Sequence, residues 1–428
     1  MLIMKHRLFS LPLSLLLVSI TAMLFQSCVK DNCTRHYYYW EPVYKTKDEV
    51  KANIKSNAAR QIERPGKIYI RGNYIFLNEM DKGIHVIDNS NPSSPRNIAF
   101  INIPGNIDIA VKGNILYADF FTDMVAIDIT NPKQVAVTKF TDNLFPERAW
   151  GNGFTSMRGM VIADWIRRDT VVAIDCGGSD GLFNPMKSRS DIMFFASQSN
   201  GRLNNATASP FGVGGSMARF TVIDNYLYGV SESSLNVVSI ANAANPVFSN
   251  KVNIGWGIET IFPFNNRLFI GSTTGMFIYD VASPANPVKL GSFGHLSSCD
   301  PVIADNYNAF VTLRSGTACQ GFSNQLDILD ITNINSPVLK MSYPMTNPHG
   351  LAKDENMLII CDGKSGVKFY NAANISNIAL LKTINGIEAY DVIAQNKWAL
   401  VVAKDGLYQY DYTSASNIKL LSKLTIQK

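Results

Sequence analysis

The chain has 428 residues, of which 46% are hydrophobic, so it is long enough to bury a large core. Its formal net charge of +5 comes from 39 basic and 34 acidic residues, with no basic run beyond the N-terminus, which argues against nucleic-acid binding. Helical periodicity is nearly absent, and this favours an all-β fold.

Residues 1–28 are expected to be a lipoprotein signal peptide. Residues 5–7 give a basic start, residues 8–25 form an apolar run, and Cys28 follows at a plausible cleavage point. The run is short for a membrane span and is interrupted by Pro12. An ordinary signal peptide is the alternative, whereas lipidation at Cys28 would anchor the chain to a membrane.

Residues 29–62 are interpreted as a tether and lead-in segment. The stretch 37–42 reads Tyr-Tyr-Tyr-Trp-Glu-Pro, which is too aromatic for a plain solvated linker. We therefore expect it either to pack on the domain that follows or to add a strand to that domain.

From residue 83 onward, a short β-branched and aromatic phrase recurs about every 40 residues, usually ending in Asp or Asn. The copies are residues 83–88, 124–128, 275–280, 326–330, 366–371 and 406–411, with a weaker copy at 235–239. The Asp and Asn residues are expected to cap the turn that follows, by accepting hydrogen bonds from backbone N–H groups, in preference to binding metal.

Each phrase belongs to a larger unit of about 40 residues. A turn such as Asn91-Pro92 follows the phrase, and another strand follows the turn. Two further strands around a tight turn come before the phrase, as in residues 107–111 and 115–118. Four antiparallel strands in this length are typical of one blade of a β-propeller.

The spacing of the phrases predicts seven blades within residues 63–428. Successive phrases end 40 to 50 residues apart, except that 111 residues separate Asp128 from Ser239. Residues 141–211 are therefore either an insertion, which we favour, or a degraded eighth blade. Within them, residues 159–165 and 170–175 are predicted to form a hairpin.

These phrases, with their Asp-x-x-Asn-Pro turns, resemble the LVIVD repeat, which is common in outer-membrane lipoproteins of Bacteroidetes. Residues 65–70 and the stretch from Cys299 to Cys319 are similar to that lipoprotein group in particular. The resemblance implies a propeller of seven or eight blades in an outer-membrane lipoprotein, either periplasmic or surface-exposed. It implies no activity.

Beyond Cys28 the chain has five cysteines: Cys33, Cys176, Cys299, Cys319 and Cys361. Cys299 precedes the first strand of one blade, and Cys319 lies between the second and third strands of the same blade. Both loops emerge on one face, so we expect a disulfide between Cys299 and Cys319, with two free thiols as the alternative. The state of the other three stays open, and no Cys-x-x-Cys zinc motif occurs.

A candidate binding site lies at the mouth of the propeller channel, on the face that carries the insertion. Polar residues just before the innermost strands are expected to ring this mouth: Asn106, Asp108, Arg219, Glu259, Asp300, His349 and Glu388. They could hold a divalent cation such as calcium, a sugar or a peptide, or they could simply be a solvated channel lining. Trp256 is expected near the same face, where its ring could stack on a sugar.

Two functions compete. The first, which we favour because no catalytic motif stands out, is a non-catalytic envelope protein that binds a protein or glycan partner on the insertion-bearing face and needs no cofactor. The alternative is a hydrolase or lyase for a glycan or lactone, with a metal in the channel mouth near Glu259, Asp300, His349 and Glu388.

Overall fold

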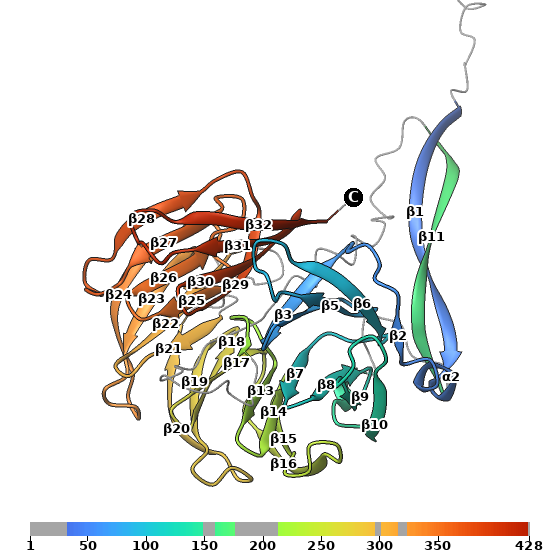
Figure 1. Ribbon diagram of the computed structural model, residues 1–428, viewed down its shortest axis with the longest axis horizontal. Helices are drawn as coiled ribbons and strands as arrows, with labels where there is room; N and C mark the ends of the chain where they lie inside the picture. Colours follow the sequence, from blue (N-terminus) through green and yellow to red (C-terminus); the bar gives the residue numbers. More distant parts are fainter. Residues whose placement is uncertain (1–31, 149–158, 176–212, 296–300, 316–322, 427–428) are drawn as a thin grey trace, which may run out of the picture. The chain divides into compact units, whose positions relative to one another are not determined.

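The computed structural model describes residues 32–148, 159–175, 213–295, 301–315 and 323–426. These residues fall into two compact units, one containing residues 32–41 and 166–175 and the other containing the rest. The larger unit is a β-propeller of seven blades, each with four antiparallel strands in sequence order (Figure 1). We call the strands of a blade A to D, from the channel outward.

The first three blades contain the following strands. Blade 1 has β3 (Pro65–Arg71), β4 (Tyr74–Glu79), β5 (Gly83–Asp88) and β6 (Arg96–Asn102); blade 2 has β7 (Ile109–Lys112), β8 (Ile115–Phe120), β9 (Asp123–Asp128) and β10 (Ala136–Thr141); blade 3 has β13 (Phe220–Ile223), β14 (Tyr226–Val230), β15 (Ser234–Ser239) and β16 (Val247–Asn253).

The next two blades repeat the pattern. Blade 4 has β17 (Ile258–Phe264), β18 (Arg267–Ser272), β19 (Gly275–Asp280) and β20 (Val288–Gly294); blade 5 has β21 (Val302–Ala304), β22 (Asn308–Leu313), β23 (Gln325–Asp330) and β24 (Val338–Pro344).

The last two blades bring the chain back to the first. Blade 6 has β25 (Leu351–Asp354), β26 (Met357–Cys361), β27 (Val367–Asn371) and β28 (Ala379–Ile384); blade 7 has β29 (Ala389–Gln395), β30 (Trp398–Ala403), β31 (Gly406–Asp411) and β32 (Lys419–Thr425). The prediction of seven four-stranded blades is thus confirmed.

The recurring phrase of the sequence is strand C, and its burial explains its composition. The middle strands B and C lie between neighbouring blades, so both of their faces are covered and nearly all their residues are buried. Strand D has one open edge, and its residues are mostly exposed, as in β20 and β24. Stacking in a ring buries faces that a single blade would leave in water.

The aspartates at the ends of strand C cap the turn to strand D, as predicted. Each side chain accepts a hydrogen bond from the backbone N–H two residues later, at 2.8 to 3.1 Å: Asp88, Asp128, Asp280, Asp330 and Asp411. Removing such an acceptor leaves a turn N–H unpaired, which costs roughly 1 kcal/mol.

The ring closes through side chains between blade 7 and blade 1. Apolar residues of both blades form one buried cluster that includes Ile75, Ile87 and Leu400. Two hydrogen bonds add to this closure, one from Gln409 Nε2 to Asn89 Oδ1 at 2.8 Å and one from Ser422 Oγ to a blade 1 backbone carbonyl at 2.6 Å.

Residues 46–57 of the lead-in contact the outer strand of blade 1 and the blade 2 residue Asp123. A short helix, α2 (Lys47–Lys51), begins at a capping box formed by Thr46 and Glu49. Lys47 forms an ion pair with the buried Asp123 of blade 2 at 2.5 Å. Strand β2 (Ser56–Asn57) then pairs with β6, so it protects the open edge of blade 1.

One expectation about local strands is wrong. Residues 160–175 form one continuous strand, β11 (Met160–Asp175), and not a hairpin. Its partner is β1 (Asn32–Thr46), which contains the aromatic stretch 37–42, so the strand that this stretch adds belongs to a two-stranded sheet with β11 (Figure 1). The backbone hydrogen-bond partners of β11 therefore come from β1, which is distant in the sequence, and not from the other arm of a hairpin.

Among the described residues, no helix combines the length and apolar character needed to cross a membrane. The signal-peptide prediction for residues 1–28 lies outside the described residues.

Candidate functional site

A short segment, residues 213–219, passes through the centre of the propeller; we call it the channel segment. Its first residues form β12 (Val213–Gly214), which pairs with the inner edge of β3 in blade 1. Ser216 donates its backbone N–H to Asp391 of blade 7 at 2.9 Å, and its hydroxyl accepts a hydrogen bond from the Leu351 N–H of blade 6. The segment therefore links blades 1, 6 and 7 on the inner side of the ring.

Glycine permits this close approach. A Cβ on Gly215 would lie 1.9 Å from Asp391 Oδ2, and a Cβ on Gly350 would lie 2.1 Å from Asp391 Oδ1. Both distances are far below van der Waals contact, so any larger residue would push the channel segment away from blades 6 and 7.

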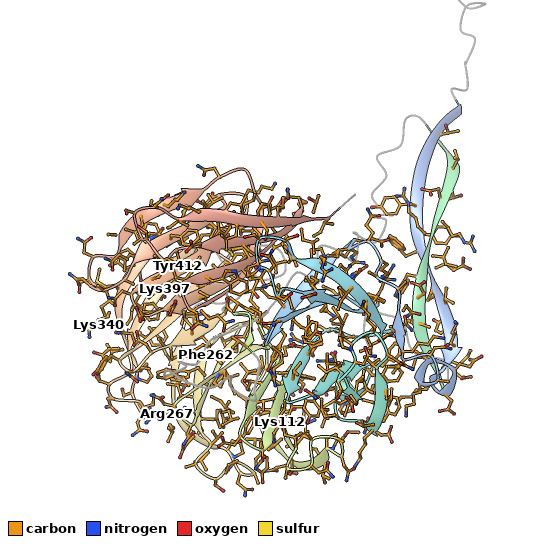
Figure 2. The ribbon with its side chains drawn as sticks, viewed as in Figure 1. Lys112, Phe262, Arg267, Lys340, Lys397 and Tyr412 are labelled. Carbon is orange, nitrogen blue, oxygen red and sulfur yellow. The ribbon has the colours of Figure 1, made fainter. Side chains whose placement is uncertain are left out.

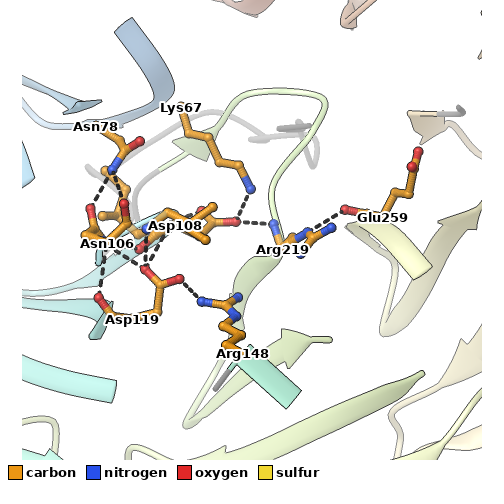
Figure 3. Close-up of polar contacts among 10 residues, drawn as sticks. Lys67, Asn78, Asn106, Asp108, Asp119, Arg148, Arg219 and Glu259 are labelled. Carbon is orange, nitrogen blue, oxygen red and sulfur yellow. Dashed lines mark hydrogen bonds and ion pairs between the residues drawn. The ribbon is translucent and has the colours of Figure 1, made fainter. Parts of the chain in front are cut away.

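Asp108 is the acceptor at the centre of the channel mouth. It forms an ion pair with Lys67 at 2.8 Å and accepts hydrogen bonds from the backbone N–H groups of Arg219 and Ile109 (Figure 3). Both charged side chains of the pair are buried. Burial lowers the pKa of Lys67 to about 8, against the opposing effect of the Asp108 carboxylate.

A second carboxylate, Asp119, organises the loop before β7. Its Oδ1 accepts hydrogen bonds from Asn106 Nδ2 at 2.6 Å and from the backbone N–H of Asp108 at 2.9 Å. Its Oδ2 pairs with Arg148, whose pKa is lowered to about 9 by burial and by the neighbouring Arg219 (Figure 3). Two of the predicted mouth residues are therefore structural groups with satisfied polar atoms.

Beside this network lies an open pocket of about 220 Å³. It is lined by Arg219 of the channel segment, Glu232 of the B–C loop of blade 3, and residues 256–259 at the start of blade 4. Trp256 stands at its rim with 79% of its surface exposed. Lone exposed apolar residues are ordinary, but a tryptophan held this far into water beside polar groups is not.

Backbone geometry keeps Trp256 exposed. Gly255 and Gly257, on either side, have φ of 140° and 73°, values that other residues rarely adopt. A Cβ on Gly257 would also lie 2.0 Å from Thr273 Oγ1. The loop thus turns the indole outward while the next residue, Ile258, is buried.

The pocket offers both a donor and an acceptor. Arg219 donates through Nε to the backbone carbonyl of Glu259 at 3.3 Å, and its two Nη atoms have no hydrogen-bond partner among the described residues (Figure 3). The Glu232 side chain likewise has no hydrogen bond or ion pair within the described part of the chain. A ligand could therefore meet a free guanidinium edge and a free carboxylate together.

The other predicted mouth residues have different surroundings. His349 is buried against the edge of Tyr390, at 5.5 Å between ring centres, and its pKa lies well below the usual value because of burial and the Arg314 charge. Glu388 forms an ion pair with Lys404 at 2.7 Å. Asp300, Cys28, Cys299 and Cys319 lie outside the described residues, so the disulfide and lipidation stay predictions.

The residues missed by sequence reasoning are Lys67, Asp119, Arg148 and Glu232. Lys67 and Asp119 are charged residues within the mostly apolar strands β3 and β8. A charged residue in such a strand indicates a buried polar partner, and this feature of the sequence could have identified both. Within the described ranges, no group of three or more His, Cys, Asp or Glu side chains is placed to hold a metal ion. The cation site stays a prediction.

The repeats match a known family model. The LVIVD repeat is found at residues 66–99, 106–138 and 318–345, which lie in blades 1, 2 and 5. No curated protein matches the chain.

Among solved structures, a protein from Lactobacillus plantarum is similar, with 12% identity, a TM-score of 0.53, and coverage of 85% of this chain and 97% of that one. The computationally designed Ika8 protein is similar at 10% identity and a TM-score of 0.51, covering 86% of this chain and 89% of that one. At these identities the likeness shows the fold alone.

Proposed function

We propose that the protein is a non-catalytic, envelope-anchored propeller that binds a protein or glycan partner on the face carrying the B–C and D–A loops. The observation that carries this proposal is the pocket at Trp256, where an exposed indole stands beside the unpaired Arg219 and Glu232 side chains. Binding residues are commonly held by loops on a rigid scaffold.

The channel segment supports a binding role because it makes this face rigid. It is bonded to blades 1, 2, 6 and 7, and its Arg219 forms one wall of the pocket. A ligand at the pocket would therefore meet side chains that are already positioned, which reduces the entropy lost on binding.

The alternative remains a hydrolase or lyase with a metal in the channel mouth. A cation there would have to compete with Lys67 for Asp108 and with Arg148 for Asp119. Of the donors predicted for that metal, Glu259, His349 and Glu388 lie within the described residues, and Asp300 lies outside them. No specific observation favours this alternative over binding.

The test compares three forms of the protein that starts at residue 29: the unchanged form, Trp256→Ala, and Tyr307→Ala. Tyr307 is a matched control because it is 65% exposed but lies in an A–B turn on the opposite face. Purified envelope glycans and envelope proteins are immobilised separately, and binding is measured by interferometry.

The proposal expects binding that Trp256→Ala abolishes and Tyr307→Ala leaves intact, with the immobilised material unchanged afterwards. Binding that depends on Tyr307 and not on Trp256 would refute the assigned face. Release of a soluble product that stops on adding a chelator would favour the hydrolase or lyase.

Anchoring at Cys28 is tested separately in the full chain. We expect the protein to partition into the detergent phase of Triton X-114, and the Cys28→Ala variant to remain in the aqueous phase or to keep its signal peptide. Equal partitioning of the two proteins, with the signal peptide removed from both as judged by mass spectrometry, would refute lipidation. Protease treatment of intact cells then distinguishes a surface-exposed from a periplasmic location.

A further inference from the structure

We infer that the pocket at Trp256 binds a single uncharged pyranose ring, which stacks on the indole and bridges Arg219 and Glu232 through neighbouring hydroxyls. This inference rests on the proposed function, because it names the ligand class of the same site. It follows from the size of the pocket, the aromatic surface at its rim and the pairing of its charges.

The size of the pocket suits one small ring. Sites for drug-sized molecules typically measure roughly 300–1,000 Å³. The pocket here is about 220 Å³ and is open on one side. A single ring, such as the terminal or side-branch sugar of a glycan, fits this volume, and the rest of the glycan would extend into solvent.

Trp256 supplies the surface on which such a ring would lie. Its indole is 79% exposed, and the positive φ of Gly255 and Gly257 fixes the backbone that presents it. One face of a pyranose carries several C–H groups, and these pack against the electron-rich face of an aromatic ring. Stacking would remove apolar surface from water on both partners.

Arg219 and Glu232 match the polar edge of a sugar. Arg219 has two unpaired Nη atoms, which donate, and Glu232 has a carboxylate, which accepts. Each sugar hydroxyl can both accept and donate, so two neighbouring hydroxyls can satisfy the guanidinium and the carboxylate at once. Charge-assisted bonds of this kind are stronger than neutral ones.

Charge and donor pattern together argue against charged ligands. Glu232 and Glu259 would repel a phosphate or carboxylate group. A lysine or quaternary ammonium group would be attracted by the two glutamates, but it would be repelled by Arg219 and would leave the Arg219 Nη donors unused. A zwitterion could match both charges, but ion pairs at a site this open to solvent are weakened by water and salt. The uncharged ring uses the aromatic surface and both polar groups without bringing a net charge into the pocket.

The experiment titrates the protein that starts at residue 29 with the methyl glycosides of glucose, galactose, mannose and N-acetylglucosamine. Saturation-transfer NMR identifies which ring protons approach the protein, and calorimetry gives the affinity. Methyl glucuronide and glycine are the charged and zwitterionic comparison probes. Trp256→Ala, Glu232→Gln and Tyr307→Ala are titrated in the same way, and circular dichroism verifies that each variant is folded.

We expect at least one neutral glycoside to bind, with saturation transfer strongest at the protons of its apolar face. Trp256→Ala should weaken that binding roughly tenfold or more. Glu232→Gln should weaken the binding less than Trp256→Ala does. Removing from the sugar the hydroxyl that contacts Glu232 should lower its affinity for the parent protein, but should change its affinity for the Glu232→Gln variant little. Tyr307→Ala should bind as the parent protein does.

Two results would overturn the inference. The first is binding of methyl glucuronide or glycine that is tighter than that of every neutral glycoside. The second is no glycoside binding at all while an envelope partner still binds in a Trp256-dependent way, which would leave the proposed function standing. If the unchanged protein binds neither an envelope partner nor any glycoside, both the proposed function and this inference are refuted.

Discussion

Replacing Asp108 by alanine should destabilise the propeller strongly, because it leaves the Lys67 ammonium buried without its counter-charge. The two side chains are 2% and 7% exposed and lie 2.8 Å apart. Removing one partner of a buried ion pair typically costs about 3–5 kcal/mol. The backbone N–H groups of Ile109 and Arg219 would also lose their acceptor, at roughly 1 kcal/mol each.

These costs overlap, so we expect a total loss of about 3–5 kcal/mol in the free energy of unfolding. The loss should be smaller at pH 9 than at pH 7. Burial lowers the pKa of Lys67 to about 8 even though the Asp108 carboxylate raises it, so in Asp108→Ala the pKa of Lys67 lies lower still. Between these two native pKa values Lys67 is deprotonated in the folded variant but protonated in its unfolded chain, so stability rises with pH in the variant and not in the parent protein. Deprotonation of Lys67 thus removes the unpaired charge, and at still higher pH both proteins gain stability equally.

The assay is urea unfolding followed by tryptophan fluorescence at pH 7 and pH 9. The double variant Lys67→Met with Asp108→Ala removes both charges and should be more stable than Asp108→Ala alone. Asp142→Ala is the control, since Asp142 is exposed and its ion pair with Lys51 should contribute less than about 1 kcal/mol. A loss no larger than that of the control, or a double variant less stable than Asp108→Ala, would refute the reasoning.

Three further predictions concern other parts of the propeller. Gly215→Ala should destabilise the protein by roughly 1–3 kcal/mol, because its Cβ would overlap Asp391 at 1.9 Å; an unchanged urea midpoint would contradict the packing argument. Glu79 should make unfolding sensitive to acid. Burial raises its pKa, but the hydrogen bond from His85 and the nearby positive charges hold it below the usual value. The stability it contributes is therefore present above the unfolded pKa and lost as pH falls through the folded pKa, and Glu79→Gln should flatten this part of the stability curve. Cys361 is fully buried, and burial raises its pKa, so its thiol should resist iodoacetamide at pH 8 until urea unfolds the chain; mass spectrometry that finds Cys361 alkylated in the native protein would contradict this.

The pocket at Trp256 could be predicted from the sequence only in part. Trp256 precedes an innermost strand, and this position predicts that it lies near the face that carries the B–C and D–A loops. The sequence could not show that Arg219 and Glu232 converge on it, since residues 219, 232 and 256 come from the channel segment and from two different loops. They meet only where blade 4 packs against blade 3, with the Ile258 N–H donating to the backbone carbonyl of Glu232 at 3.1 Å.

The blades themselves were determined by the sequence. Apolar alternation, tight turns and the Asp cap at the end of strand C are local features, and they repeat at a constant spacing. Each blade pairs strands that are consecutive in the chain, so local pattern was sufficient to predict the strand order within a blade. It favoured seven blades over eight, and the structure settles the number at seven.

Tertiary structure decided the remainder, wherever partners are far apart in the chain. Residues 160–175 fit a local hairpin as a pattern, yet β11 pairs with β1, more than a hundred residues earlier. Lys67 and Asp108 are 41 residues apart, and Asp391 lies 175 residues from Ser216. Backbone and charged groups must find partners wherever burial places them, and burial across the channel depends on closure of the whole ring.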